Sequence, residues 1–169
     1  IGSSQTLSVQ IATSGYINVI NSTFNTSAST TTGTASYNRS WYLDAYVNDS
    51  SGVAVSGANI TATNNSGAVV FSALTGADGR IVRQLVREYT QNATSTYYDT
   101  NYTVNSTDFA RLNNSQQVNL TQSKLIYATL DNAVPQAYDI NASPTSPATF
   151  SPLQTYQFNA TWTDDVAVD

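Results

Sequence analysis

Short runs of apolar residues, each ended by a turn signal, recur along most of the chain. Between residues 41 and 130 the turns fall at residues 49–52, 64–67 and 76–79. Each turn contains glycine, asparagine or aspartate, which tolerate a positive φ or hydrogen-bond their own backbone. Short strands with a turn about every ten residues are typical of an antiparallel sandwich. We therefore predict an all-β fold, an antiparallel sandwich with flanking β segments.

Alternation of apolar and polar residues assigns one face of each strand to the core. The predicted core contains Trp41, Leu43, Ile60, Phe71, Val104, Val118 and Leu120. Residues 68–74 are almost continuously apolar, which predicts a central strand buried on both faces. Residues 80–88 have helical spacing, but we predict a strand there because the surroundings are turn-punctuated β and Val, Ile and Tyr favour strands.

The segments on either side of this region are too short to fold alone. Residues 1–36 hold two strand-like runs, 7–11 and 16–20, and then a Ser/Thr-rich tract at 26–36 that we interpret as an extended linker. Residues 132–135 read as a second linker, after which Tyr156, Phe158, Ala160 and Trp162 alternate inward like the opening of a second sandwich. The predicted division is therefore 1–36 (β segment and linker), 37–131 (sandwich) and 132–169 (linker and the beginning of a second sandwich).

Charge is scarce in this chain and its balance is acidic. Charged residues make up 10%, the net charge is −5, and Lys124 is the only lysine. Nucleic-acid binders carry clustered Lys and Arg, so we exclude that class of partner. No run approaches the roughly 18 apolar residues of a membrane span. Because Ile1 is not an initiator methionine, we expect the chain to be processed or to be part of something longer.

The strongest chemical signal is the Asn-x-Ser/Thr sequon, which marks N-glycosylation in secreted proteins. Thirteen of the seventeen asparagines lie in one. With roughly 27% Ser plus Thr, chance would give about four or five. In the sequons of Asn59, Asn101, Asn119 and Asn159 the middle residue is the inward one, which leaves Asn and Thr on the solvent face. The predicted glycosylation sites are Asn21, Asn25, Asn38, Asn48, Asn59, Asn64, Asn92, Asn101, Asn105, Asn113, Asn119, Asn141 and Asn159. The alternative is that Asn and Thr merely decorate exposed strand faces, although strands normally avoid Asn.

Catalysis has few candidate residues here. The chain has no His and no Cys, so it offers neither a triad nor a thiolate nucleophile, and no pair of carboxylates is set apart for acid–base work. We expect no enzyme and no cofactor. Asp164, Asp165 and Asp169 cluster near the C-terminus, and such oxygen clusters can bind Ca²⁺. Without EF-hand spacing, we interpret them as solvated turn residues.

Leu7, Val9 and Ile11 alternate as a strand that could be donated to another copy of the chain. Strand donation provides main-chain hydrogen bonds and pockets for alternate side chains. A head-to-tail contact of this kind need not close, so it builds a fibre. The prediction is that residues 5–12 pair with a different copy; the alternative is a fragment whose ends continue into further domains.

Two stretches resemble known families. VNDSSG at 47–52, VSGANI at 55–60 and TGADG at 75–79 resemble the carboxypeptidase-regulatory-like, transthyretin-like sandwich over roughly half the chain. SPTSPATFSP at 143–152 and YQFNATWTDD at 156–165 look like the start of Ig-like repeats in archaeal cell-surface glycoproteins, with an incomplete repeat. The resemblance implies an extracellular, cell-surface protein with no catalytic residues.

We expect a structural role. The favoured function is an N-glycosylated building block of an extracellular filament, sheath or surface layer, whose partners are copies of itself and covalent N-glycans. The alternative is an adhesion or carbohydrate-binding module of a larger surface protein.

Overall fold

A computed structural model describes residues 9–109, 111–131, 136–145, 149 and 151–163. Apart from one 3₁₀ turn, η1 (Thr26–Ala28), its regular elements are all strands. The strands before the first long turn are β1 (Gln10–Ile11), β2 (Tyr16–Ile20), β3 (Thr30–Thr31) and β4 (Ser36–Asp49). The sandwich continues with β5 (Asn59–Thr63), β6 (Val69–Leu74), β7 (Gln84–Asn92), β8 (Thr96–Tyr98), β9 (Tyr102–Asp108), β10 (Arg111–Val118) and β11 (Lys124–Leu130). The last two strands are β12 (Gln136–Ser143) and β13 (Gln157–Thr163). The predicted all-β class is confirmed.

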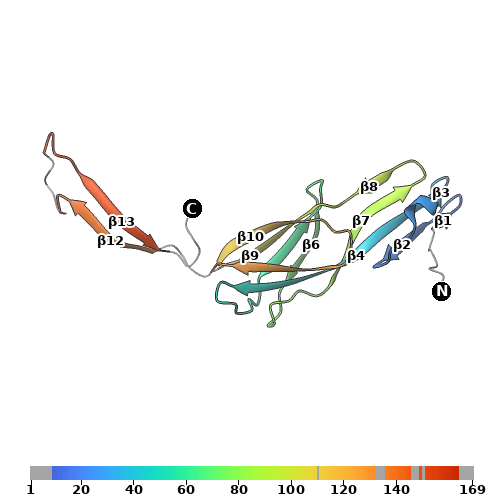
Figure 1. Cartoon of the computed structure of the whole chain (residues 1–169), viewed down its shortest axis with the longest axis horizontal. Coiled ribbons are helices and arrows are strands. Elements are labelled where there is room, and N and C mark those ends of the chain that lie inside the picture. The colour runs from blue at the N-terminus through green and yellow to red at the C-terminus, as the bar shows by residue number, and fades with distance from the viewer. Residues whose placement is uncertain (1–8, 110, 132–135, 146–148, 150, 164–169) are drawn as a thin grey trace, which may run out of the picture.

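Two sheets form the body of the molecule (Figure 1). One has the strand order β10-β9-β5-β6, and the other has the order β11-β4-β7-β8 with β2 also paired to β4. Most pairs are antiparallel, as expected. The exceptions are β2 and β11, which both run parallel to the long strand β4, β2 along its first half and β11 along its second. The sandwich is therefore mixed rather than purely antiparallel.

The core lies between these two sheets and follows the predicted parity. Trp41, Leu43, Ile60, Val104, Val118 and Leu120 are all buried, and Phe71 packs against them half-buried. Alternation predicted these positions because each strand has one face in the core and one face in water. Residues 84–92 form a strand, as expected from the β context, although it begins later than the apolar run.

The run at 68–74 is not a central strand. β6 has one strand neighbour, β5, and stands at the edge of its sheet among the described strands. Val69 and Leu74 are 62% and 66% exposed. The run is apolar on both sides of the pleat, yet only Phe71 and Ala73 reach the core.

The Ser/Thr-rich tract at 26–36 is folded rather than a plain linker. It contains η1 and β3, and β3 pairs with β1. Val9 and Ile11, proposed for donation to another copy, therefore lie in a segment that pairs inside its own chain. The expected pairing of residues 5–12 with a second copy is wrong for the described part of that segment, because the tract folds back to supply the partner strand. Leu7 lies outside the described residues.

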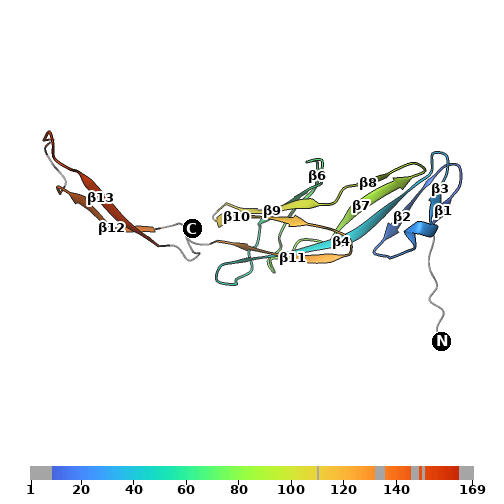
Figure 2. The same ribbon diagram turned by 45° about the horizontal axis from the view of Figure 1, so that its top comes forward.

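β12 and β13 form a two-stranded antiparallel hairpin that stands apart from the sandwich (Figures 1 and 2). Phe158 is 80% exposed, and Ala160 is exposed as well. The inward alternation expected here is wrong for these two residues, because none of the described strands forms a second layer over this hairpin. The division into 1–36, 37–131 and 132–169 stays a prediction.

Candidate functional site

The sequon side chains lie at the surface. Wherever the structure describes the side chain of a sequon asparagine, that residue is exposed or half-buried and never buried. Asn113 is in β10, but its side chain is not among those described. The inward position of the middle residue is confirmed for three sequons, because Ile60, Tyr102 and Leu120 are fully buried. It fails for Asn159, whose middle residue Ala160 is exposed.

Two of these sequons share the outer face of the β10-β9-β5-β6 sheet. Asn105 lies directly between Ser115 of β10 and Thr61 of β5. Asn59 is on the same face, in register with Thr107. This outer face is thus a surface of amides and hydroxyls, the reverse of the apolar inner face.

The asparagines differ in how their amides are used. Asn64 Oδ1 accepts hydrogen bonds from the backbone N–H groups of Ser66 and Ala68, and Asn92 Oδ1 holds its own turn in a similar way. Asn101 and Asn159 are exposed, and within the described chain their amides make no hydrogen bond. Asn64 and Asn92 therefore have a local structural role that explains their presence without a glycan, whereas Asn101 and Asn159 do not.

A polar cavity of about 410 Å³ lies beside the first half of β4. Its walls come from β4, β7, β8 and the tract around η1. It is lined by Thr26, Ser27, Ser29, Tyr37, Arg39, Glu88, Tyr89, Gln91, Thr96 and Tyr98. Sequence reasoning did not identify this group, because its members are dispersed over seventy residues.

A β-bulge lies at the only glutamate of the chain, which lines this cavity. In the β4–β7 ladder Arg39 pairs with Tyr89 and Ser40 pairs with Arg87, so Glu88 is the extra residue between them. A bulge of this kind redirects a side chain. Glu88 and Tyr89 are consequently buried side by side, where strict alternation from the buried Val86 would have turned Tyr89 outward.

Glu88 is held by two partners from β4. Its Oε2 accepts a hydrogen bond of 2.6 Å from Trp41 Nε1 and lies 3.2 Å from Arg39 Nε. The Arg39 guanidinium carbon stands 4.7 Å from the centre of the Trp41 ring, at cation–π distance. A buried charge pair of this type is tolerated when additional hydrogen bonds satisfy it, and its net charge is zero.

Two polar atoms at this cavity have no hydrogen-bond partner in the described chain. They are Tyr89 Oη and Arg39 Nε. Arg39 Nε is close to Glu88 Oε2, but its N–H does not point at that oxygen. Burial, and next the proximity of Tyr89, raises the pKa of Tyr37 to about 12. The cavity therefore presents phenol groups, aliphatic hydroxyls and one cancelled charge pair, which suits a small uncharged polar molecule better than an ion.

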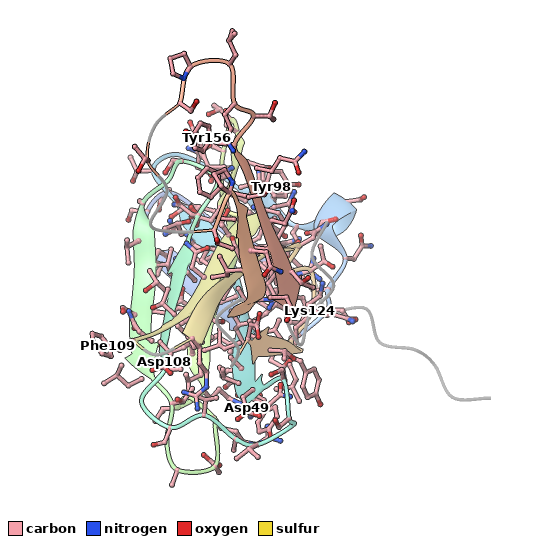
Figure 3. The ribbon with its side chains drawn as sticks, turned by 90° about the vertical axis from the view of Figure 1, so that its left-hand side faces the viewer. Asp49, Tyr98, Asp108, Phe109, Lys124 and Tyr156 are labelled. Atoms are coloured by element: carbon pink, nitrogen blue, oxygen red, sulfur yellow. The ribbon has the colours of Figure 1, made fainter. Side chains whose placement is uncertain are left out.

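The acidic residues do not form a metal site in what the structure describes. Asp164, Asp165 and Asp169 lie outside the described residues. Asp78 is exposed and accepts a hydrogen bond from the backbone N–H of Arg80, as a turn aspartate does. Asp108 sits near the β9–β10 turn, where the neighbouring Phe109 projects into solvent (Figure 3). Among the described residues, no three His, Cys, Asp or Glu side chains are grouped closely enough to hold a metal ion.

No family model matches the chain. No curated protein matches it either. Among solved structures, a point mutant of the shaft pilin SpaA from Lactobacillus rhamnosus GG is similar, with 10% identity and a TM-score of 0.34. The match covers 59% of this chain and 53% of the pilin chain, so it spans about half the length of that protein. In the part of the chain that the structure describes, no helix is long and apolar enough to cross a membrane.

Proposed function

We propose that this protein is a structural, N-glycosylated building block of an extracellular filament, sheath or surface layer, and that its copies assemble through β-strand contacts. The single observation that carries the proposal is the open edge of β6. The partners of the protein are further copies of the same chain, and covalent N-glycans keep the rest of its surface soluble.

The β6 edge has the properties of a strand-pairing surface. Proteins that avoid edge-to-edge pairing place Lys, Pro or inward charges on their edge strands, or cover the edge. Residues 69–74 read VVFSAL and contain none of these. Leu74 and Val69 are largely exposed there. Pairing with another copy would satisfy the free backbone groups of β6 and bury both side chains.

The sequons support the extracellular setting. The outer face that contains Asn59 and Asn105 is polar, and β6 borders it without a sequon of its own. Glycans on this face would cover the flat polar surface; the one on Asn59 would stand beside the end of β6, because Asn59 is in register with Leu74. An acidic chain with few charges needs such a source of solubility.

Polymerisation of the purified glycoprotein tests the proposal. Sedimentation velocity and negative-stain microscopy over a concentration series should show regular polymers for the native sequence. Leu74→Lys, at a position 66% exposed on the β6 edge, should leave monomers. Val53→Lys, at a turn position 61% exposed, is the matched control and should still polymerise. A protein that stays monomeric at every concentration, or two lysine variants that behave alike, would count against the proposal.

The polar cavity favours a second candidate, an adhesion or carbohydrate-binding module of a larger surface protein. Aromatic faces with hydroxyl and amide groups, and no net charge, match the apolar face and the hydroxyls of a sugar. A glycan screen should then give binding that Tyr98→Ala removes. Tyr97→Ala is the control, because Tyr97 is similarly exposed but does not line the cavity. Binding that is lost equally in both variants, or absent from the native protein, would contradict this candidate.

A further inference from the structure

Residues 9–48 have a regular geometry of their own. Each described strand residue of the first half pairs, in parallel, with the residue 20 positions later: Gln10 with Thr30 in the β1–β3 pair, and Tyr16 with Ser36 in the β2–β4 pair. The separation stays the same from one pair of strands to the next. Constant parallel pairing at a fixed period is the mark of a coiled β-solenoid, in which each coil stacks on the one before. We name residues 9–28 coil 1 and residues 29–48 coil 2.

The corner between the two strands of each coil repeats as well. Thr13 has φ 69° and Gly33, 20 residues on, has φ 63°. A positive φ is uncommon for threonine, so the match is not a generic turn preference. Backbone hydrogen bonds continue through the corner, from Thr34 N to Thr13 O at 3.0 Å and from Ser36 N to Gly15 O at 3.1 Å. The coils are therefore stacked along their corners as well as their strands.

One side-chain ladder also follows the period. Asn38 Nδ2 donates to Asn18 Oδ1 at 3.0 Å. Stacked asparagines of this type stabilise parallel in-register strands.

The stack is closed on one side and open on the other. Beyond coil 2, β4 is paired with β7, so the sandwich covers that side. On the coil 1 side, β1 and β2 have no further strand neighbour among the described residues, and β1, β2 and β3 lie at the end of the molecule opposite the C-terminal hairpin (Figure 2). We name this free side, formed by β1 and β2, the coil edge.

The side chains of coil 2 are covered by coil 1, whereas those of coil 1 at the coil edge have no coil over them among the described residues. Tyr37 of coil 2 is 2% exposed because it lies in a buried cluster with Val9 and Val19 of coil 1, whereas Ile17, its register partner, is 43% exposed. A hollow of about 420 Å³ lies over coil 1, lined by Val9, Gln10, Ile17, Asn18, Val19, Ile20 and Ser22. Residues 9–38 contain no charged residue and no proline, so the coil edge has none of the usual protections against pairing.

We propose that the coil edge is the stacking surface for one further parallel coil of the same 20-residue build, placed N-terminal to coil 1, and that the sandwich is the C-terminal cap of a β-solenoid. We infer that this neighbour is another coil because it would continue the interface between coil 1 and coil 2. It places an apolar side chain over Ile17 and Val19, fills the hollow, and extends the asparagine ladder from Asn18. This inference does not rest on the proposed assembly, because the β6 edge belongs to the other sheet.

Insertion of a duplicate coil tests the inference. A second copy of residues 9–28 is inserted directly before Val9 in the full chain, and amide hydrogen exchange is followed by residue. Stacking should slow exchange in β2 of the original coil by on the order of tenfold or more, because its free N–H groups gain partners. The inserted copy should itself be protected at the positions equivalent to residues 16–20. A matched insert with Ile17→Asp and Val19→Asp in the duplicate only should give neither effect.

The result is interpretable even if the insert fails to order. Exchange protection of β4 and β9 reports separately whether the sandwich is folded. A folded sandwich with an unprotected insert and unchanged exchange in β2 would overturn the inference. So would sedimentation showing that the native chain pairs with a second copy through the coil edge, with protection of β2 that depends on protein concentration.

Discussion

Replacement of Trp41 by phenylalanine tests whether the hydrogen bond between Trp41 and Glu88 stabilises the fold. Trp41 is 3% exposed, and its Nε1 donates to Glu88 Oε2 at 2.6 Å, with Glu88 itself 5% exposed. Phenylalanine keeps most of the packing but removes the donor. A hydrogen bond to a charged group contributes about 1.5–3 kcal/mol, and the cost is highest where the acceptor stays buried. We expect Trp41→Phe to lower the free energy of unfolding by about 2 kcal/mol, and Trp41→Ala by about 3–5 kcal/mol because it adds a cavity.

Urea unfolding followed by circular dichroism measures both values. Tyr127→Phe, on the exposed outer face of β11, is the control and should stay within about 0.5 kcal/mol of the native protein. A double-mutant cycle of Trp41→Phe with Glu88→Gln should give a coupling of about 0.5–3 kcal/mol, because the two side chains are in contact. The hydrogen bond between Trp41 and Glu88 does not stabilise the fold if Trp41→Phe lowers the free energy of unfolding by less than about 0.5 kcal/mol. The same conclusion follows if the effects of the two substitutions on that free energy are additive.

Further expectations concern modification, turns and pH. Peptide mapping of natively sourced protein should find glycans on Asn59, Asn101, Asn119 and Asn159 and none on Asn18, which is exposed but outside any sequon; bare asparagines at all four would refute the glycosylation claim. Asn64→Ala should cost about 1 kcal/mol in urea unfolding, because two backbone N–H groups lose their acceptor, while Asn101→Ala should be neutral. The folded-state pKa of Tyr37 is raised from 10.0 to about 12, so its contribution to stability is complete below pH 10 and is lost as the pH rises towards 12. Melting temperatures across that window should fall less steeply for Tyr37→Phe than for the native chain, and equal slopes would contradict this assignment.

The sequence predicted the strands whose two faces meet different surroundings. β4, β5 and β9 alternate because one face packs in the core and the other meets water, so Leu43, Ile60 and Val104 could be assigned without a structure. β6 could not be placed in this way. An apolar run is compatible with a central or an edge strand, and which strands pair is not a local property of the sequence.

The cavity and the two coils could not be predicted from the sequence either, and the reasons are physical. The bulge at Glu88 breaks the period of two, so parity counted from Val86 assigns the buried Tyr89 to the wrong face. The two coils have one identical residue among their paired positions, Asn18 and Asn38, because backbone stacking constrains the conformation more than the side chains. A search for internal periods could have detected that asparagine pair only as a weak signal.

The central claim is that copies of this protein join through the free edge of β6, and residue-resolved hydrogen exchange on assembled and dissociated protein tests it directly. The account predicts that those amides of residues 69–74 that do not bond to β5 exchange freely in the dissociated protein and become protected in the polymer, while the exposed turn at 64–67 does not change. A polymer in which β6 exchanges as fast as it does in the monomer would show that the copies meet elsewhere and would contradict the account.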